Sequence, residues 1–393
     1  MKKTPSSVIP HIAVFGKRNS GKSSLINALT GQSLAIVSDI AGTTTDPVYK
    51  SFELLPFGPV IFIDTAGLDD SGELGKKRIE KTLEVLNKTD LALIVIDGEI
   101  TDLEKNLIKT LHKKQIDFIK IFNKSDIRNY EKVDGVKTSA LNGEGIGELK
   151  LKIVSLLKKK DDFFLEGLLS DLVKPGGYAV FVVPIDEEAP KGRLILPQTQ
   201  AIRSALDNDS FCLVVKEREL YYALNLVKQN PDIVITDSQA FLKVAADVPE
   251  EIPMTSFSIL FARFKGDLEL FVEGAREIEN LKDGDKVLIM EACSHHQICD
   301  DIGTVKIPRL LRQYTGKKLD FVFHKGRGFD FEKNRVKLVI HCGGCMLNRR
   351  AMLSRMDFFK ENGIKITNYG ITIAYTLGIL PRALKPFGIE FEY

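Results

Sequence analysis

The sequence lacks the features of membrane, secreted and nucleic-acid-coating proteins. It has no tryptophan and only five cysteines in 393 residues, too few for a disulfide framework. No apolar run approaches the roughly 20 residues that span a bilayer, and the first lysines precede no apolar signal core. The formal net charge is +2, whereas a polyanionic partner needs a clear basic excess. We therefore expect a cytoplasmic protein that binds neither membrane nor nucleic acid.

The length and the order of apolar segments predict an α/β fold with three α/β domains. A chain of 393 residues exceeds one typical core, and short β-rich runs alternate with helical patterns along it. A turn-rich break at 172–177 follows the first block, and Pro249 and Pro253 separate the second from the third. We predict domains at 1–160, 175–252 and 256–393, the first with a doubly wound, mostly parallel sheet.

Apolar periodicity gives the expected elements. Strands are expected at 12–15, 60–63, 91–96, 118–122, 178–183, 211–215, 233–236, 286–290, 319–323 and 337–340. Helices are expected at 22–29, 74–86, 147–157, 199–206, 220–227 and 349–360, and a helical stretch at 256–281.

Residues 16–23 read Gly-Lys-Arg-Asn-Ser-Gly-Lys-Ser, which is the spacing of a phosphate-binding loop. The segment follows a predicted strand and opens a predicted helix, as such loops do. Its glycines let backbone N–H groups wrap phosphates, and the helix amino end adds a favourable dipole. Lys22 is expected to neutralise the β and γ phosphates, and Ser23 to bind Mg²⁺.

Three further segments identify the nucleotide as GTP. Asp64, in Asp-Thr-Ala-Gly, can hold a Mg²⁺-bound water, and the Gly67 N–H can sense the γ-phosphate. Asp126, in Asn-Lys-Ser-Asp, can accept hydrogen bonds from two guanine donors that adenine does not offer. The loop 139–141 is expected to lie against the guanine base and support it. The predicted nucleotide site consists of Gly16, Asn19, Ser20, Gly21, Lys22, Ser23, Ser24, Asp64, Thr65, Gly67, Asn123, Lys124, Asp126, Ser139, Ala140 and Leu141.

The run Gly-Thr-Thr-Thr-Asp at 42–46 resembles the TrmE–Era–EngA group of GTPases. The resemblance implies that Thr44 joins Ser23 and Asp64 around Mg²⁺, and that Asn19 helps to bind K⁺, which stimulates hydrolysis. Leu68 stands where many small GTPases carry a glutamine that orients water. We therefore predict slow basal GTP hydrolysis with Lys22, Thr44 and Gly67 as catalytic groups, and K⁺ supplying positive charge.

Four cysteines fall in the last third of the chain, and three of them join histidines in two groups that each follow a predicted strand. These groups are Cys293-Ser-His295 and His341-Cys342-Gly-Gly-Cys345. If the two strands are parallel neighbours, their carboxyl ends emerge side by side, so both groups can surround one metal centre. The residues leave three interpretations open: a structural zinc site, an iron–sulfur cluster, or buried cysteines. Cys299, Asp300 and Asp301 are further candidate ligands.

The GTPase motifs together with Cys-x-His and His-Cys-x-x-Cys resemble the [FeFe]-hydrogenase maturation GTPase family, HydF, over the whole chain. The resemblance implies a [4Fe–4S] cluster on Cys293, Cys342 and Cys345, with His295 and His341 at matched positions whose ligand role stays open. It implies a GTPase domain, a middle dimerisation domain and a cluster domain. It also implies a homodimeric scaffold that carries the two-iron precursor between radical-SAM maturases and the hydrogenase apoprotein. The alternatives are a ribosome-associated GTPase with a structural zinc domain, and a redox sensor.

Overall fold

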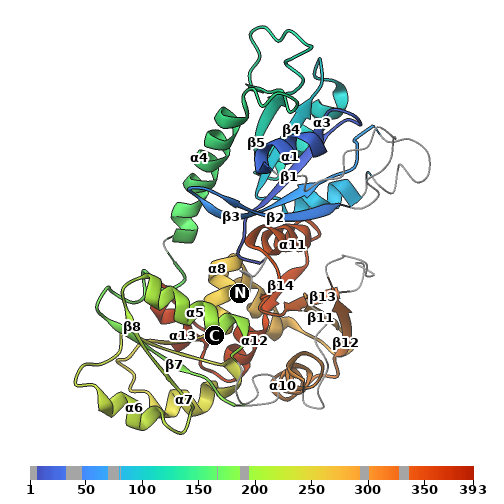
Figure 1. Cartoon of the computed structure of the whole chain (residues 1–393). Coiled ribbons are helices and arrows are strands. Elements are labelled where there is room, and N and C mark those ends of the chain that lie inside the picture. Colours follow the sequence, from blue (N-terminus) through green and yellow to red (C-terminus); the bar gives the residue numbers. More distant parts are fainter. Residues whose placement is uncertain are drawn as a thin grey trace. The chain divides into compact units, whose positions relative to one another are not determined.

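A computed structural model describes residues 7–31, 47–69, 79, 81–165, 167–185, 194–292, 301–326 and 336–393, with the backbone alone over 160–165 (Figure 1). The chain divides into two compact units, residues 1–162 and 163–393. Among the described helices, none combines the length and the apolar character needed to cross a bilayer.

The first unit contains a six-stranded sheet with the order β2-β3-β1-β4-β5-β6. Its strands are β1 (His11–Gly16), β2 (Val48–Leu54), β3 (Gly58–Asp64), β4 (Leu91–Ile96), β5 (Asp117–Phe122) and β6 (Val136–Lys137). Its helices are α1 (Lys22–Thr30), η1 (Leu86–Lys88), α3 (Asp102–Lys113) and α4 (Ile146–Leu165). Of the strand pairs described, β2 with β3 is antiparallel and the others are parallel. The predicted doubly wound, mostly parallel sheet is confirmed.

Both faces of this sheet are covered, which explains the continuous apolar strands. Every residue of β1 and β4 is buried. Alternate residues of β1 enter two different cores: Ile12 and Val14 pack with α1 and α4, whereas Ala13 and Phe15 pack with α3. A strand buried on both faces carries no polar alternation, as is usual in parallel sheets.

The second unit contains two four-stranded parallel sheets, ordered β10-β9-β7-β8 and β12-β11-β13-β14. The strands are β7 (Tyr178–Val182), β8 (Phe211–Val215), β9 (Ile233–Thr236), β10 (Met254–Ser256), β11 (Lys286–Glu291), β12 (Asp320–Lys325), β13 (Val336–His341) and β14 (Lys365–Asn368). The helices are α5 (Leu196–Asp207), α6 (Leu220–Leu226), η2 (Ser238–Ala240), α7 (Phe241–Asp247), α8 (Phe257–Lys265), α9 (Leu268–Ala275), η3 (Arg276–Asn280), η4 (Ile302–Lys306), α10 (Ile307–Thr315), α11 (Arg349–Glu361), α12 (Tyr369–Thr376), α13 (Leu380–Leu384) and η6 (Lys385–Phe387).

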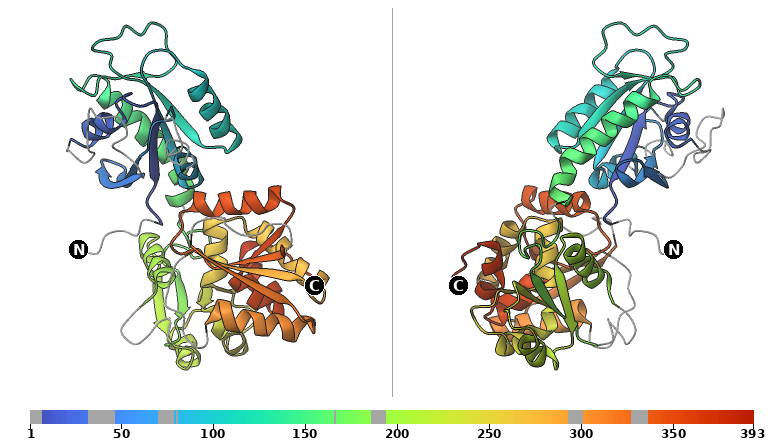
Figure 2. Two further views of the ribbon diagram at one scale, coloured as in Figure 1. Left: turned by 90° about the vertical axis from the view of Figure 1, so that its right-hand side faces the viewer. Right: turned by 60° about the vertical axis from the view of Figure 1, so that its left-hand side comes forward.

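The strand order places a topological switch point between β11 and β13. The chain leaves β11 through α10 to reach β12 on one side, and it leaves β13 through α11 to reach β14 on the other. Parallel crossovers are right-handed, so the two helices lie on opposite faces of the sheet, as Figure 2 shows. The connections diverge at the carboxyl ends of β11 and β13, which is where open α/β sheets bind ligands.

One hydrophobic core joins the two sheets of the second unit. Val180 and Val234 of the first sheet belong to the same buried cluster as Leu288 and Val339 of the second. The predicted helical stretch at 256–281 is not continuous. It is divided into α8, α9 and η3, because Gly266 ends α8 and the Asp267 carboxylate accepts the Leu270 N–H at the start of α9.

Candidate functional site

The phosphate-binding loop has the backbone conformation that its sequence requires. Gly21 has φ 93° and Asn19 has φ 55°, both in the left-handed region that glycine and asparagine tolerate best. A Cβ atom at Gly16 would collide with the Val95 carbonyl, and one at Gly21 with the Asn123 amide. The glycines are therefore needed for close approach as well as for backbone conformation.

The residues expected to bind Mg²⁺ and phosphate lie together beside this loop. Lys22 Nζ donates to the carbonyls of Gly16 (3.2 Å) and Lys17 (2.7 Å), both in the phosphate loop. Ser23 Oγ donates to Asp64 Oδ2 at 2.6 Å. The other carboxylate oxygen, Asp64 Oδ1, is buried and has no hydrogen-bond partner within the described part of the chain. A buried carboxylate oxygen without a hydrogen-bond partner, next to a serine hydroxyl, is suited to binding a hydrated divalent cation.

Burial raises the pKa of Asp64, and this effect exceeds the opposing effects of the Ser23 hydrogen bond and the Lys22 charge. A bound Mg²⁺ would favour the ionised carboxylate, because a cation lowers the pKa of a neighbouring acid.

Asn123 connects the two ends of the nucleotide site. Its Nδ2 donates to the Ser20 carbonyl of the phosphate loop at 2.9 Å. Its Oδ1 accepts from Thr138 Oγ1 and from the Ala140 N–H, both at 3.2 Å, in the loop that should buttress the base. Ser139 Oγ donates to Asp126 Oδ1 at 2.6 Å and so orients the carboxylate expected to select guanine. The sequence-predicted residues of three separate segments are thus brought together.

The remaining predicted nucleotide residues have different surroundings. Thr65 Oγ1 donates to the Val14 carbonyl at 2.7 Å, which fixes the start of the Asp-Thr-Ala-Gly segment against β1. Ser24 is half-buried on α1, whereas the Leu141 side chain is 87% exposed. A Cβ atom at Gly67 would collide with Arg18, so this segment passes close to the phosphate loop. Thr44 lies outside the described residues.

Two residues of the guanine end were not predicted from the sequence. Asp97 follows β4 and forms an ion pair with Lys124 at 2.6 Å. The Tyr130 hydroxyl donates to the Asn123 carbonyl at 2.7 Å and accepts the Gly98 N–H at 3.0 Å. Asp97 could have been recognised from its position after an apolar strand, whereas Tyr130 had no motif to mark it.

The second predicted site lies at the switch point of the carboxy-terminal sheet. Met290 and His341 are register partners on the parallel strands β11 and β13, and the Cys342 N–H donates to the Met290 carbonyl at 2.8 Å. The Ala292 N–H donates to Cys342 Sγ at 3.3 Å. Cys293 lies outside the described residues, but it is bonded to Ala292, which contacts the Cys342 sulfur. The two strands are parallel neighbours, which is the arrangement that a shared metal centre requires.

Cys342 and Cys345 are half-buried in a short loop, which we call the cysteine loop, residues 342–347. Gly344 has φ 59°, and the Leu347 N–H donates to the Gly344 carbonyl at 2.9 Å to close a turn. The loop ends at Asn348, whose side chain accepts the Ala351 N–H and begins α11. Two thiols on one turn, with the end of β11 beside the first sulfur, form part of a donor set suited to iron or zinc.

His341 is fully buried and both of its ring nitrogens are engaged. Arg355 Nη1 lies 2.7 Å from Nε2, and the Cys342 carbonyl oxygen lies 2.6 Å from Nδ1. Arginine only donates, so Nε2 accepts and Nδ1–H donates. Burial, with a smaller contribution from the Arg355 charge, lowers the pKa of His341 to about 3, so the imidazole is neutral. His295 lies outside the described residues.

Two buried cations near this site were not predicted from the sequence, Lys265 against the cysteine loop and Arg355 against His341. Lys265 ends α8 and is 1% exposed, and Arg355 of α11 is 2% exposed. Burial lowers the pKa of Lys265 to about 8, although Cys345 and Cys342 oppose the shift. No motif marks Lys265 in the sequence, where it follows Phe-Ala-Arg-Phe.

Within the described ranges, no group of three histidine, cysteine or carboxylate side chains forms a metal site. Cys299 and Asp300 lie outside those ranges. Asp301 is buried and its Oδ1 accepts the N–H and the hydroxyl of Thr304 at 2.8 and 2.9 Å, which begins η4.

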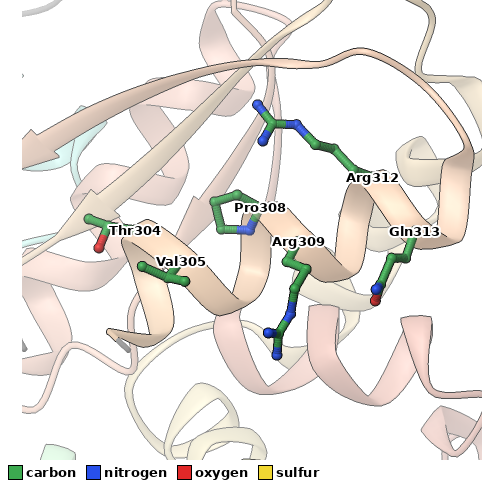
Figure 3. A pocket seen from close by; sticks show the side chains of 6 residues that line it. All are labelled: Thr304, Val305, Pro308, Arg309, Arg312 and Gln313. Carbon is green, nitrogen blue, oxygen red and sulfur yellow. The ribbon is translucent and has the colours of Figure 1, made fainter. Parts of the chain in front are cut away.

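A shallow hollow lies on η4 and α10, and it includes none of the predicted site residues (Figure 3). It is lined by Thr304, Val305, Pro308, Arg309, Arg312 and Gln313. Arg312 turns away to the Leu319 carbonyl and the Phe321 ring, so its guanidinium already has protein partners.

The strand, phosphate loop, Mg²⁺ carboxylate and guanine loop of residues 11–141 define a P-loop GTPase domain. The family model described as a 50S ribosome-binding GTPase matches residues 11–124. GTPase Der of Kosmotoga olearia is 30% identical over 207 residues, which cover 47% of this chain and 46% of that protein. The tRNA modification GTPase MnmE of Aquifex aeolicus is 38% identical over 152 residues, 36% of this chain and 33% of that one. The chain therefore spans less than half the length of these curated relatives.

The residues after the GTPase domain identify the family to which the chain belongs. The hydrogen maturase F dimerization domain matches residues 168–266, and the hydrogen maturase F tetramerization domain matches residues 269–386. Together they cover more than half of the chain, which belongs to the hydrogen maturase F family, the [FeFe]-hydrogenase maturation GTPases. These two matches favour this family over the alternative of a ribosome-associated GTPase.

Solved structures similar to the chain include Aquifex aeolicus Era bound to GDP and AlF4⁻, at 26% identity. That match has a TM-score of 0.35 and covers 38% of this chain and 56% of that one. The G domain of the T. maritima FeoB iron transporter is 28% identical, with a TM-score of 0.30, and the match covers 38% of this chain and 99% of that one.

Proposed function

We propose that the chain is a GTP-hydrolysing switch whose carboxy-terminal domain holds a [4Fe–4S] cluster and carries the two-iron precursor of [FeFe]-hydrogenase. One observation carries this proposal most strongly. Loops with cysteines follow two neighbouring parallel strands at a switch point, and the Ala292 N–H already contacts the Cys342 sulfur. Family membership and the GTP site support the same function.

In the proposed hydrolysis, the chain supplies binding, orientation and charge. Lys22 exchanges its two carbonyl partners for phosphate oxygens, and Ser23 and Asp64 hold Mg²⁺ and its water. The Gly67 N–H, held close to the phosphate loop, contacts the γ-phosphate. Thr44 completes the Mg²⁺ site when the γ-phosphate is present. Leu68 cannot orient a water, so basal turnover is slow and positive charge near Asn19 accelerates it.

In the proposed cluster site, Cys293, Cys342 and Cys345 hold the iron–sulfur group. His341 would have to give up the Arg355 hydrogen bond before its Nε2 could bind iron, so we assign it an orienting role on the Cys342 carbonyl. His295 follows Cys293 closely in sequence and is the better histidine candidate. A cluster on three cysteines offers one iron position that cysteine does not fill, to which a transferable iron complex can bind.

The proposed partners are a second copy of the chain, radical-SAM maturases and the hydrogenase apoprotein. The β8 edge of the middle sheet supports self-association, because Phe211 and Val214 there are 69% and 45% exposed. Apolar side chains on an edge strand favour pairing with another chain.

Anaerobic purification tests the cluster directly. The wild-type chain should show the broad visible absorbance of an iron–sulfur protein, with about four iron and four sulfide per chain. Cys342→Ser should lose most of both and still hydrolyse GTP at the wild-type rate. Cys212→Ser is the matched control, because Cys212 lies half-buried in β8 of the other sheet. Stoichiometric zinc without sulfide would reject the carrier function.

The K⁺ proposal has its own test. GTP hydrolysis is measured in equal concentrations of KCl and NaCl for wild type and Asn19→Gly. Glycine tolerates the φ of 55° at this position, so the loop keeps its conformation while the amide is lost. We expect the wild type to be faster in KCl and the variant to lose most of this preference. Equal wild-type rates in the two salts would exclude a K⁺ site.

A further inference from the structure

Lys265 makes an unusual set of contacts with the cysteine loop. Its Nζ donates to the carbonyls of Gly344 (3.2 Å), Cys345 (3.0 Å) and Leu347 (2.8 Å). The side chain is 1% exposed. An ammonium group has three donors, and here all three are directed to backbone atoms of one turn. The lysine therefore fixes the path of the backbone on both sides of Cys345.

The position of Lys265 in the chain makes this contact long-range. Lys265 is the last residue of α8, in the segment matched by the dimerization model, whereas the cysteine loop lies in the segment matched by the tetramerization model. Arg349, next to the loop, donates in return to the carbonyls of Phe264 (2.6 Å) and Gly266 (3.2 Å) at the end of α8. The helix end and the loop are thus joined from both directions.

Satisfying three carbonyls does not by itself require a charge. A neutral amide could donate to two of them without the cost of burying an ammonium group, which amounts to several kcal/mol per ion. Carbonyl dipoles and the Phe261 ring, 5.8 Å from Nζ, stabilise the cation but do not neutralise it. A second buried cation, Arg355, donates to His341 Nε2 and to the Gly326 carbonyl at 2.8 Å. Buried positive charge therefore lies against the loop and against the histidine that precedes it.

The chemistry of the cluster explains this excess. Three thiolates give a [4Fe–4S] group a net negative charge, and one-electron reduction makes that charge larger. Fixed positive charge in a low-dielectric interior stabilises the reduced form more than the oxidised form. Net charge, burial and hydrogen bonds are the factors by which a protein sets the potential of a cluster.

We propose that Lys265 is a positioning residue of the iron–sulfur site, which orients the cysteine loop and raises the reduction potential of the cluster by charge compensation. This inference rests on the function proposed above. It adds a residue of the middle segment to the cluster site, and it predicts an electrostatic effect that a purely structural lysine would not have.

The test uses the full-length chain, reconstituted anaerobically with iron and sulfide, as wild type, Lys265→Met and Lys265→Gln. Methionine removes the charge and the donors, whereas glutamine keeps amide donors and removes the charge. Arg263→Met is the matched control, because Arg263 is a cation of the same helix that pairs with Asp171 at 2.6 Å. Iron and sulfide content, the midpoint potential and the resonance spectrum of the reduced cluster are measured for each.

We expect both Lys265 variants to shift the midpoint potential to more negative values by similar amounts, and Arg263→Met to keep the wild-type potential. Lys265→Met should also lose part of its iron, whereas Lys265→Gln retains more because its amide still holds the loop. If Lys265→Met does not fold, Lys265→Gln alone decides the question.

Two negative outcomes are distinguishable. Wild-type potentials in cluster-bearing Lys265→Gln would overturn the role of Lys265 and leave the carrier function intact. A wild-type chain that binds no iron and sulfide would overturn the proposed cluster, and this inference with it.

Discussion

Asp126 is held by the Ser139 hydroxyl at 2.6 Å, so one carboxylate oxygen is oriented before any nucleotide arrives. A carboxylate accepts two hydrogen bonds from the guanine edge, whereas an amide accepts one and donates one. Hydrogen bonds to a charged group contribute about 1.5–3 kcal/mol each. We therefore expect selection of the base at this site to depend mainly on a single side chain.

Asp126→Asn should weaken GTP binding by about two orders of magnitude or more and improve binding of xanthosine triphosphate, whose edge offers an acceptor to the new amide. Titration with fluorescent analogues of both nucleotides measures the change. Asp134→Asn is the control, because Asp134 is an exposed acid that pairs with Lys120. Unchanged GTP affinity in Asp126→Asn would show that the base is recognised elsewhere.

At the scale of elements, α9 packs against β14 at a distance that only glycine permits. A Cβ atom at Gly274 would overlap the Ile366 carbonyl, and this backbone atom cannot move without disturbing the sheet. Gly274→Ala should therefore destabilise the second unit by about 1–3 kcal/mol or more. Denaturant unfolding followed by circular dichroism measures this. Gly147→Ala in α4, where a Cβ atom meets open space, should instead be neutral or stabilise by up to about 1 kcal/mol.

Three elements meet at Glu279 of η3, and their tyrosines should titrate abnormally. The Tyr314 and Tyr375 hydroxyls both donate to Glu279 Oε1, at 2.6 and 2.9 Å. Burial and the Glu279 hydrogen bond raise the pKa of Tyr314 to about 12, and burial also raises the pKa of Tyr375. Because folding raises these pKa values, their contribution to stability is complete below pH 10 and is lost as the pH rises through 12.

The absence of tryptophan makes the tyrosinate absorbance a clean measure of this titration. We expect Tyr314 and Tyr375, together with the buried Tyr369, to ionise only with alkaline unfolding, and Glu279→Gln to lower the pKa of Tyr314. Tyr222→Phe, which removes a side chain 74% exposed, is the control and should leave the late-ionising tyrosines in place. Titration of all tyrosines near pH 10 in the folded chain would contradict the pattern.

The strands that carry the two sites could be predicted from the sequence, because they are apolar and bounded by motifs. The expected strands 91–96, 211–215 and 233–236 match β4, β8 and β9 in both bounds. The antiparallel edge strand β2 was missed, because its lysine and glutamate interrupt the apolar pattern. α3 was missed although Thr101 and Glu104 form a capping box, with the Thr101 N–H donating to Glu104 at 2.9 Å.

The residues of the candidate sites also divide into those that could be predicted from the sequence and those that could not. Motif residues such as Lys22, Ser23 and Asp64 could be found because loop chemistry is local in sequence. Lys265 and Arg355 could not, because their importance depends on which loop the fold brings against them. The expected helix at 74–86 lies largely outside the described residues.

At the scale of the whole molecule, the division at residue 162 predicts two separate unfolding transitions. Calorimetry of the full chain should resolve them, and GDP with Mg²⁺ should raise the midpoint of one only. Ligand at about 100 times its dissociation constant stabilises the domain that binds it by about 2.7 kcal/mol. Cys342→Ser should affect the other transition. A single transition that shifts as a whole with nucleotide would mean that the two units unfold together.

The hydrophobic core shared by the two sheets of residues 163–393 has a consequence for assembly. The segments matched by the dimerization and tetramerization models share this core with the loop that bears Cys342 and Cys345, so rearranging subunits would move each loop without reshaping it. How far apart the loops of neighbouring subunits lie is then a property of the quaternary arrangement. An oligomer can therefore expose or cover this loop by rotation of its subunits alone.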